Sequence, residues 1–230
     1  MFSSGYVVDQ RISSFMAGVY GWMSCALAVT ASAAYYIAHT PVFFHYIQTH
    51  PLVLIGIFIG QLAFVFSLVF FLNRMNFITA LVLFLLYSVS VGVTISSIFY
   101  VYTEISIFST FLTTALTFAV MSFYGYMTKS DLTTMGNMSF MALIGIIVGT
   151  VINMFLQSAQ FDYLLSGLGV IVFVLLTAYD TQKIKQLGSS MISHQEIMPK
   201  ITLLGALTLY LDFINLFLFL LRFIGKQRDQ

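Results

Sequence analysis

The chain has 230 residues, of which 60% are hydrophobic and only 7% are charged. Soluble domains carry about 25% charged residues, so this composition excludes a soluble globular protein and predicts one that crosses a membrane several times. The net charge of +1 gives no information about an acidic or nucleic-acid partner, and no nucleic acid is expected because the sequence has no basic patch. The single cysteine excludes a disulfide framework and a cysteine metal site.

Seven mostly apolar segments follow one another, each read as one crossing of a hydrocarbon layer ~30 Å thick. They cover residues 15–38, 52–72, 77–102, 105–127, 138–155, 163–179 and 201–224. The sequence therefore predicts an all-α integral membrane protein with seven transmembrane helices. We expect a short cytoplasmic N-terminal tail over residues 1–14, a single transmembrane domain over 15–224 and a short polar C-terminal tail over 225–230.

The connections between these segments are short, which makes consecutive helices antiparallel neighbours. Only the link over residues 181–200 has any size. Because short loops rich in lysine and arginine stay cytoplasmic, their positions predict the orientation of the chain. With the N-terminus inside, six basic residues lie on the cytoplasmic side: Arg11, Arg74, Lys129, Lys183, Lys185 and Lys200.

The basic residues at the C-terminal end break this pattern. Seven crossings place Arg222, Lys226 and Arg228 outside. Either the earlier loops decide the orientation, or the last segment is a re-entrant hairpin whose tail returns to the cytoplasm. We favour seven crossings.

Two glycine pairs with the spacing of four residues predict close helix packing, namely Gly56 with Gly60 and Gly145 with Gly149. Such pairs can drive homodimerisation, but close packing inside one chain is the favoured interpretation. The sequence does not predict the oligomeric state.

Asp212 lies in the middle of the last segment. An ionised carboxylate at that depth costs roughly 2.5 to 3.5 kcal/mol, so it should be paired, protonated or beside a wet cavity. Its polar and small neighbours follow at spacings of three and four, which predicts one stripe that faces the bundle interior. The stripe comprises Thr202, Gly205, Thr208, Asp212 and Asn215. A plainer alternative is that Asp212 only ties helices together through hydrogen bonds.

Asp180, near the end of the sixth segment, is the natural partner of Asp212. If that helix continues a turn or two past Tyr179, Asp180 lies near the cytoplasmic mouth, with Lys183 at i+3. Asp212 lies ~18 Å into a helix that starts on the same side. The two carboxyls are therefore expected to meet only if the last helix starts deeper or breaks near Gly205. A simple loop acid is the alternative interpretation of Asp180.

If the carboxyls meet, their chemistry is constrained. Two carboxylates in a poorly solvated site cannot both ionise easily, so they share one proton and act as a proton sensor. Arg74, after the second segment, could bridge the ionised pair and release the protonated pair. Two carboxylates with a few carbonyl or amide oxygens suit a weak Ca²⁺ site. Thr208, Asn215 and Lys183 are expected to support this site, and no cofactor is expected besides Ca²⁺ as the bound or transported ion.

Three runs carry a family resemblance: FMAGVYGWMSCALAVTASAA over 15–34, TAYDTQKIK over 177–185 and GALTLYLDFINLFLFLLRF over 205–223. With them the chain resembles the Bax inhibitor-1, or transmembrane Bax inhibitor motif, family, and most closely its short bacterial members. The resemblance covers nearly the whole chain.

This resemblance implies seven helices with the last one central, in a bacterial inner membrane. It also implies a pH-dependent Ca²⁺ leak, gated by two aspartates of the sixth and seventh helices. By motif these are Asp180 in AYDTQK and Asp212 in LYLDFINLF. The arginine that latches them in the family is placed at Arg74 by position only. The implied partners are the lipid bilayer, Ca²⁺ and protons.

Two other classes of function were weighed. A non-transporting regulator would bind a membrane protease or a stress or cell-death protein through its helices, and nothing in the sequence excludes it. An intramembrane aspartyl protease also has a Tyr-Asp pair, like Tyr179-Asp180. Its second aspartate should follow a Gly-x-Gly pattern, but Leu209-Tyr210-Leu211 precede Asp212 and no Pro-Ala-Leu sequence follows. We therefore expect no enzymatic activity.

Overall fold

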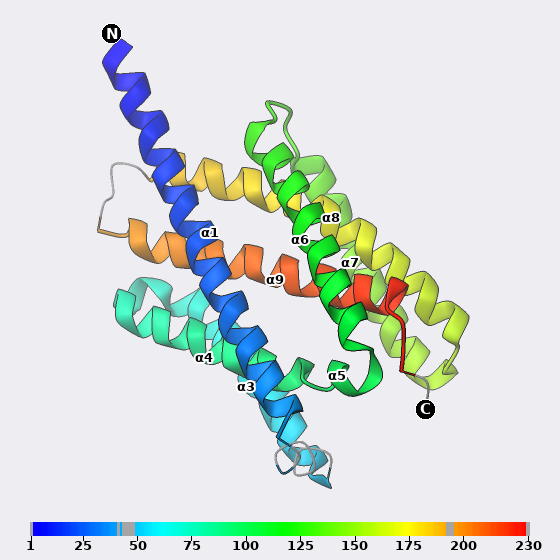
Figure 1. The fold of residues 1–230 in the computed structure, drawn as a ribbon. Helices are drawn as coiled ribbons and strands as arrows, with labels where there is room; N and C mark the ends of the chain where they lie inside the picture. The colour runs from blue at the N-terminus through cyan, green and yellow to red at the C-terminus, as the bar shows by residue number, and fades with distance from the viewer. Residues whose placement is uncertain (1, 41, 43–48, 192–195, 229–230) are drawn as a thin grey trace. The chain divides into compact units, whose positions relative to one another are not determined.

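The structure is a computed structural model that describes residues 2–40, 42, 49–191 and 196–228. Within these ranges every named element is a helix (Figure 1). They are α1 (Phe2–Ala38), α3 (Pro51–Phe71), the 3-10 helix η1 (Leu72–Arg74), α4 (Phe77–Ile95), α5 (Ile98–Val101), α6 (Glu104–Met127), α7 (Thr133–Leu156), α8 (Ala159–Ser190) and α9 (Met198–Ile224).

Among the described residues six helical stretches are long and apolar enough to cross a membrane, and one of them, Phe77–Val101, covers both α4 and α5. Of the seven predicted segments, the second falls short, because the apolar part of α3 covers only Ile55–Phe71. The prediction of an all-helical integral membrane protein is thus confirmed. The number of seven spans stays a prediction.

Two predicted boundaries differ from the structure in an informative way. The third segment is interrupted, because α4 ends at Ile95 and α5 begins at Ile98. The hydroxyl of Ser96 donates to the carbonyl of Val93 at 2.7 Å, a local bond that competes with regular helix geometry. At the N-terminal end, α1 begins at Phe2, so residues predicted as a tail are helical.

The link predicted over residues 181–200 is wrong for most of its length. Helix α8 continues to Ser190, and α9 begins at Met198. The physical reason is that TQKIKQL contains good helix formers, and its apolar Ile184 is buried beside the core. Charge ends a hydropathy segment, but it does not end a helix.

The chain forms two compact units. The N-terminal unit comprises Met1–Val101 and Gly188–Tyr210, and the C-terminal unit comprises Tyr102–Leu187 and Leu211–Gln230. Helix α9 therefore supplies its first half to one unit and its second half to the other. Within the N-terminal unit, α4 packs against both α1 and α3.

Tyr210 fills the centre of the N-terminal unit. Its side chain is fully buried, and the rings of Phe84 and Tyr87 meet it edge-on at 5.7 and 5.9 Å between centroids. The hydroxyl groups of Tyr210 and Thr30 are hydrogen-bonded at 2.7 Å, and Thr30 donates to the carbonyl of Ser88 at 2.9 Å. This network joins α9, α1 and α4 through groups that find no water in the core.

Removal of the Tyr210 hydroxyl tests this network. We expect Tyr210→Phe to lower the free energy of unfolding by about 1 kcal/mol, because one buried hydrogen bond is lost while the ring packing remains. The measurement is the thermal unfolding of the purified protein in detergent. Tyr124→Phe is the matched control, because Tyr124 is exposed. Equal melting temperatures for the wild type and Tyr210→Phe would contradict the role of the hydroxyl.

The C-terminal unit is built by close approaches of α6, α7 and α9 to α8. A Cβ atom at Gly125 of α6 would overlap the carbonyl of Ala178, and one at Gly136 of α7 would overlap the ring of Tyr179. The ring of Phe219 on α9 lies where a Cβ atom of Gly169 would be. The first two contacts pack α6 and α7 closely against Ala178 and Tyr179, the residues of α8 just before Asp180.

The predicted glycine pairs account for little of this packing. Of the four, only Gly149 has a tight neighbour, the side chain of Leu165. A Cβ atom at Gly56, Gly60 or Gly145 would meet no described atom within 4 Å. The prediction of close packing within the chain is confirmed for Gly149 and wrong for the other three, because a four-residue spacing does not tell a packed face from one that faces lipid.

The C-terminal tail is attached to the start of α6. The amide of Thr103 donates to the carbonyl of Lys226 at 3.2 Å, and the amide of Lys226 donates to Oγ of Ser106 at 2.8 Å. Helix α9 runs without a break to Ile224. The alternative of a re-entrant hairpin in the last segment is therefore wrong, and the end of α9 lies beside the connection before α6.

Two of the basic residues at this end have acidic neighbours. Arg222 lies 3.4 Å from Asp162, and Arg228 lies 3.6 Å from Glu104. All four side chains are well exposed. Such exposed pairs contribute at most about 1 kcal/mol each, so they mark proximity more than stability.

Candidate functional site

Asp212 is a buried carboxyl in the middle of α9. Its side chain is only 5% exposed, and Leu209 and Leu216, one turn before and one turn after, are fully buried. The oxygen Oδ2 is buried with no hydrogen-bond partner among the described residues. An unsatisfied polar atom in such a place costs about 1–3 kcal/mol, so packing alone gives no reason for an aspartate at this position.

Asp180 is the group that meets Asp212. It lies on α8, is half-buried, and its carboxyl lies close enough to the carboxyl of Asp212 for the two groups to act on each other. Ionised carboxylates only accept hydrogen bonds, so a direct hydrogen bond between the two would need a proton on one of them.

The two aspartates meet for a reason that the sequence analysis missed. Helix α9 neither starts late nor breaks near Gly205, because it is continuous from Met198 to Ile224. Instead, α8 continues for three turns beyond Asp180, which places Asp180 ~15 Å from the end of its helix. Asp212 lies ~21 Å from the start of α9. Both carboxyls are therefore deep in their helices, and the expected mismatch in depth disappears.

The structure gives the other residues of the predicted stripe local partners. Thr208 Oγ1 donates to the carbonyl of Leu204 at 3.1 Å, and Asn215 Nδ2 donates to the carbonyl of Leu211 at 2.8 Å. Both side chains are half-buried, so they lie on the less buried side of α9, next to Asp212 along the helix. Their supporting role stays a prediction.

The two predicted basic residues have different positions. Lys183 is exposed on α8, its ammonium lies 5.5 Å from the centre of the Tyr179 ring, and its charge acts on Asp180. Arg74 ends η1 in the N-terminal unit and is exposed. Its role as a latch stays a prediction.

The donor set limits what the pair can bind. Among the described residues no group of three or more histidine, cysteine, aspartate or glutamate side chains could hold a metal ion. Two carboxyls offer at most four oxygens, whereas Ca²⁺ takes six to eight ligands. A Ca²⁺ ion at the pair would need water or carbonyl oxygens as well, which makes the predicted site a weak one.

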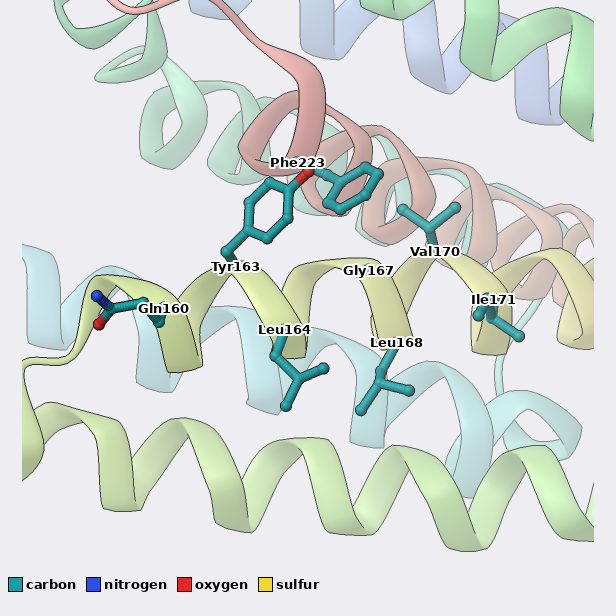
Figure 2. Close-up of a pocket in the computed structure, with 8 residues that line it drawn as sticks. All are labelled: Gln160, Tyr163, Leu164, Gly167, Leu168, Val170, Ile171 and Phe223. Atoms are coloured by element: carbon teal, nitrogen blue, oxygen red, sulfur yellow. The ribbon is translucent and has the colours of Figure 1, made fainter.

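An apolar groove lies along the first half of α8, away from the carboxyl pair. It has a volume of about 570 Å³ and is lined by Gln160, Tyr163, Leu164, Gly167, Leu168, Val170, Ile171 and Phe223. Figure 2 shows the rings of Tyr163 and Phe223 facing each other, with centroids 4.6 Å apart. Ile171 is ~13 Å along α8 from Asp180, and the lining is almost entirely apolar. This groove has no carboxylate in its lining and is separate from the pair.

Thr181, Gln182 and Lys185, which follow Asp180, were not among the predicted site residues. Thr181 and Gln182 are buried, and Lys185 is half-buried. Because residues 181–200 were predicted to be a loop, these polar residues were not singled out, since polar residues are ordinary in a solvated loop. Their signal was the helical spacing of Thr181, Gln182 and Lys185 from Ala178.

A family model and three related proteins show what this chain is similar to. The family model described as "Inhibitor of apoptosis-promoting Bax1" matches residues 12–229. The inner membrane protein YbhL of Escherichia coli (strain K12) is 48% identical over 228 residues, which cover 98% of this chain and 97% of that protein. An uncharacterized protein of Borreliella burgdorferi is 42% identical over 217 residues, with 94% of each chain covered. An uncharacterized membrane protein of Streptococcus pyogenes serotype M1 is 32% identical, with 95% of each chain covered.

Proposed function

The chain belongs to the family of the inhibitor of apoptosis-promoting Bax1, and from this premise we propose that it is a pH-sensitive Ca²⁺ leak channel. Its place would be the bacterial inner membrane, because the similar protein YbhL is named for that membrane. The observation that carries the proposal is the pair of neighbouring carboxyls, Asp180 and Asp212, inside two helices long and apolar enough to cross a membrane.

Burial gives the pair its proposed sensitivity to protons and cations. Two carboxyls in contact and out of water titrate as one unit, so the first proton strongly influences the second. A divalent cation that enters would replace the shared proton and use the same hard oxygens. Protons and Ca²⁺ then compete for one site, so a rise of the flux at low pH has to come from the opening of the gate and not from tighter binding of Ca²⁺.

The proposed gate closes when Arg74 bridges the ionised pair and opens when protonation releases it. In the proposed architecture seven helices cross the membrane, the N-terminus is cytoplasmic and the last helix is central. The burial of α9 supports its central place, because 67% of its most apolar window is buried, against 17–44% for the other five candidate spans.

We propose no enzymatic reaction for the pair. Proteolysis between two aspartates needs room for a substrate backbone beside the second one. The residues that precede Asp212 include Leu209 and Tyr210, and both are fully buried. This packing supports a site for ions and protons.

Flux measurements on purified protein in liposomes test the proposal. We expect Ca²⁺ entry into dye-loaded vesicles to rise as the pH falls from about 8 to about 5. Asp180→Asn and Asp212→Asn should each move the pH of half-maximal flux by about one unit or more, because each breaks a coupled titration. Glu196→Gln is the matched control, since Glu196 is an exposed acid in the turn before α9.

Two results would overturn the leak. One is wild-type protein that passes no Ca²⁺ at any pH. The other is a flux whose size and pH dependence stay the same in both aspartate variants. A protein that copurifies with the chain, in the absence of any flux, would point instead to a membrane regulator.

A further inference from the structure

Helix α8 has a second polar side, opposite Asp180. Ala178, Thr181, Gln182 and Lys185 follow at i, i+3, i+4 and i+7, so they share one face, which we call the anchoring face. Asp180 is two residues from both Ala178 and Gln182, which is ~200° around the helix. One side of α8 therefore carries the anchoring face, and the other presents Asp180 to Asp212.

The anchoring face packs tightly against α6. Oγ1 of Thr181 and Oγ of Ser122 are hydrogen-bonded at 2.8 Å, and both side chains are buried. One turn further along α6, Gly125 lets the backbone of Ala178 approach so closely that no Cβ atom would fit. These two contacts set the distance between α6 and α8 beside the carboxyl pair.

Gln182 binds the connection between α6 and α7 with both ends of its amide. Oε1 accepts from the backbone amide of Leu132 at 3.0 Å, and Nε2 donates to the carbonyl of Ser130 at 2.8 Å. Leu132 is the N-cap of α7 and has no side-chain cap of its own. The side chain of Gln182 is 7% exposed, so both bonds form out of bulk water. A single side chain of α8 thus holds a whole connection.

Lys185 completes the face at the end of α6. Its ammonium donates to the carbonyl of Tyr126 at 2.8 Å and lies 4.5 Å from the centre of the Tyr126 ring. The last carbonyls of a helix have no partner within the helix, and they attract cations. The charge of Lys185 therefore interacts with the end of α6, on the opposite side of α8 from the carboxyl pair.

We propose that the anchoring face, with Gln182 at its centre, positions Asp180 against Asp212 and ties the carboxyl pair to the α6–α7 connection. This inference rests on the proposed role of the pair. A slide of α8 by one residue, ~1.5 Å with a turn of ~100°, breaks both bonds of Gln182 and turns Asp180 away from Asp212. Movement of the connection and separation of the carboxyls are then one event.

The charges around the pair are few. The groups that act on Asp180 are Lys183 on its own helix and Asp212 on α9. The α6–α7 connection carries Lys129 and Asp131, both exposed. Hydrogen bonds from Thr133 lower the pKa of the Asp131 carboxyl, so it stays ionised at neutral pH. A cation or partner bound at this exposed connection would affect the carboxyl pair indirectly, through the hydrogen bonds of Gln182.

Infrared titration of the carboxyls in the full-length protein in detergent tests the positioning role. The C=O band of Asp212 is identified by its loss in Asp212→Asn, and its pH midpoint is compared with and without Asp180→Asn. We expect this difference to be about one pH unit or more in the wild type, because the groups are in contact. In a Gln182→Ala background the difference should fall by at least half. In a Gln186→Ala background it should not change, because Gln186 is an exposed glutamine one turn further along α8.

Each remaining outcome decides the matter. Equal coupling in the wild type and Gln182→Ala overturns the proposal, even if Gln182→Ala is less stable, because a merely structural residue would lower stability alone. Absence of coupling in the wild type overturns it too. If Gln182→Ala does not fold, Gln182→Glu takes its place, since it keeps the acceptor for Leu132 and loses the donor to Ser130. Unchanged coupling in Gln182→Glu then overturns the proposal.

The same measurements separate this proposal from the leak. If wild-type vesicles pass no Ca²⁺ but Gln182→Ala uncouples the carboxyls, the positioning role holds and the leak fails. If Ca²⁺ flux depends on both aspartates while the coupling between the two carboxyls is the same with and without Gln182→Ala, the leak holds and the positioning role fails.

Discussion

Gly125→Ala is expected to lower the melting temperature of the purified protein by roughly 4–8 °C. The added Cβ atom would overlap the backbone of Ala178, which cannot rotate away as a side chain can. Overpacking of this kind costs typically 1–3 kcal/mol, and 1 kcal/mol corresponds to about 2–4 °C for a chain of this size. The measurement is thermal unfolding in detergent, followed by loss of helical circular dichroism.

The same substitution at Gly145 is the control. Gly145 lies in a similar helix, but a Cβ atom there meets no described atom within 4 Å. Alanine is also the better helix former by about 1 kcal/mol, so Gly145→Ala should be neutral or slightly stabilising. Equal melting temperatures for the two variants would contradict the close approach of α6 and α8. Because Ala178 is two residues from Asp180, Gly125→Ala should also weaken the coupling of the carboxyl pair.

The second large effect is expected at the site itself, where Asp212→Leu should stabilise the protein. Leucine has the same branching at Cγ as aspartate and removes a buried carboxyl whose Oδ2 has no partner among the described residues. Removal of a buried polar atom that has no partner recovers its desolvation cost, about 1–3 kcal/mol. Asp180 is only half-buried, so it can turn toward water and Lys183. We expect the melting temperature to rise by about 3–6 °C, as 1 kcal/mol is worth about 2–4 °C.

Asp212→Asn is the matched comparison, because it keeps the shape and a buried polar group while it loses the charge. It should gain less stability than Asp212→Leu. A fall in melting temperature for both variants would show that the pair stabilises the fold and would argue against a costly group kept for function. The thermal unfolding is measured at about pH 7, in the same detergent as the flux preparations.

The transmembrane character and the importance of Asp212 were predictable from the sequence, because the apolar interior of a membrane strongly disfavours charged residues. A long apolar run is typical of a transmembrane helix, and an ionisable residue within such a run indicates a functional site. The family prediction, based on the runs around Asp180 and Asp212, is confirmed by a match over residues 12–229. The role of the pair stays a prediction.

The geometry that brings Asp180 to Asp212 was not predictable in the same way. Hydropathy ends the sixth segment at Tyr179, since charged and amide side chains follow. The helix continues because the polar residues Thr181, Gln182 and Lys185 find partners on α6 and its connection to α7. Such partners lie some 50 to 60 residues away in the chain, as the bond from Gln182 to Ser130 shows, and no local pattern reports them.

Close packing was also only partly visible. Glycine spacing pointed to Gly56, Gly60 and Gly145, which have open surroundings, and it missed Gly125. The tight approach at Gly125 depends on where the backbone of Ala178 runs, which is a property of the fold.

The division of α9 between the two units has a consequence for biosynthesis. Tyr210 completes the core of the N-terminal unit, and Asp212 and Phe213 complete that of the C-terminal unit, yet all three belong to α9, which is made after α1 to α8. At 5–20 residues per second, synthesis of 230 residues takes roughly 10–50 s. Neither unit can complete its core until α9 has been made. Until then, the partners of α9, such as Thr30 and Asp180, must wait in the bilayer or the insertion machinery with polar groups unsatisfied. A nascent chain arrested before Leu209 should therefore be a ready substrate for membrane quality control.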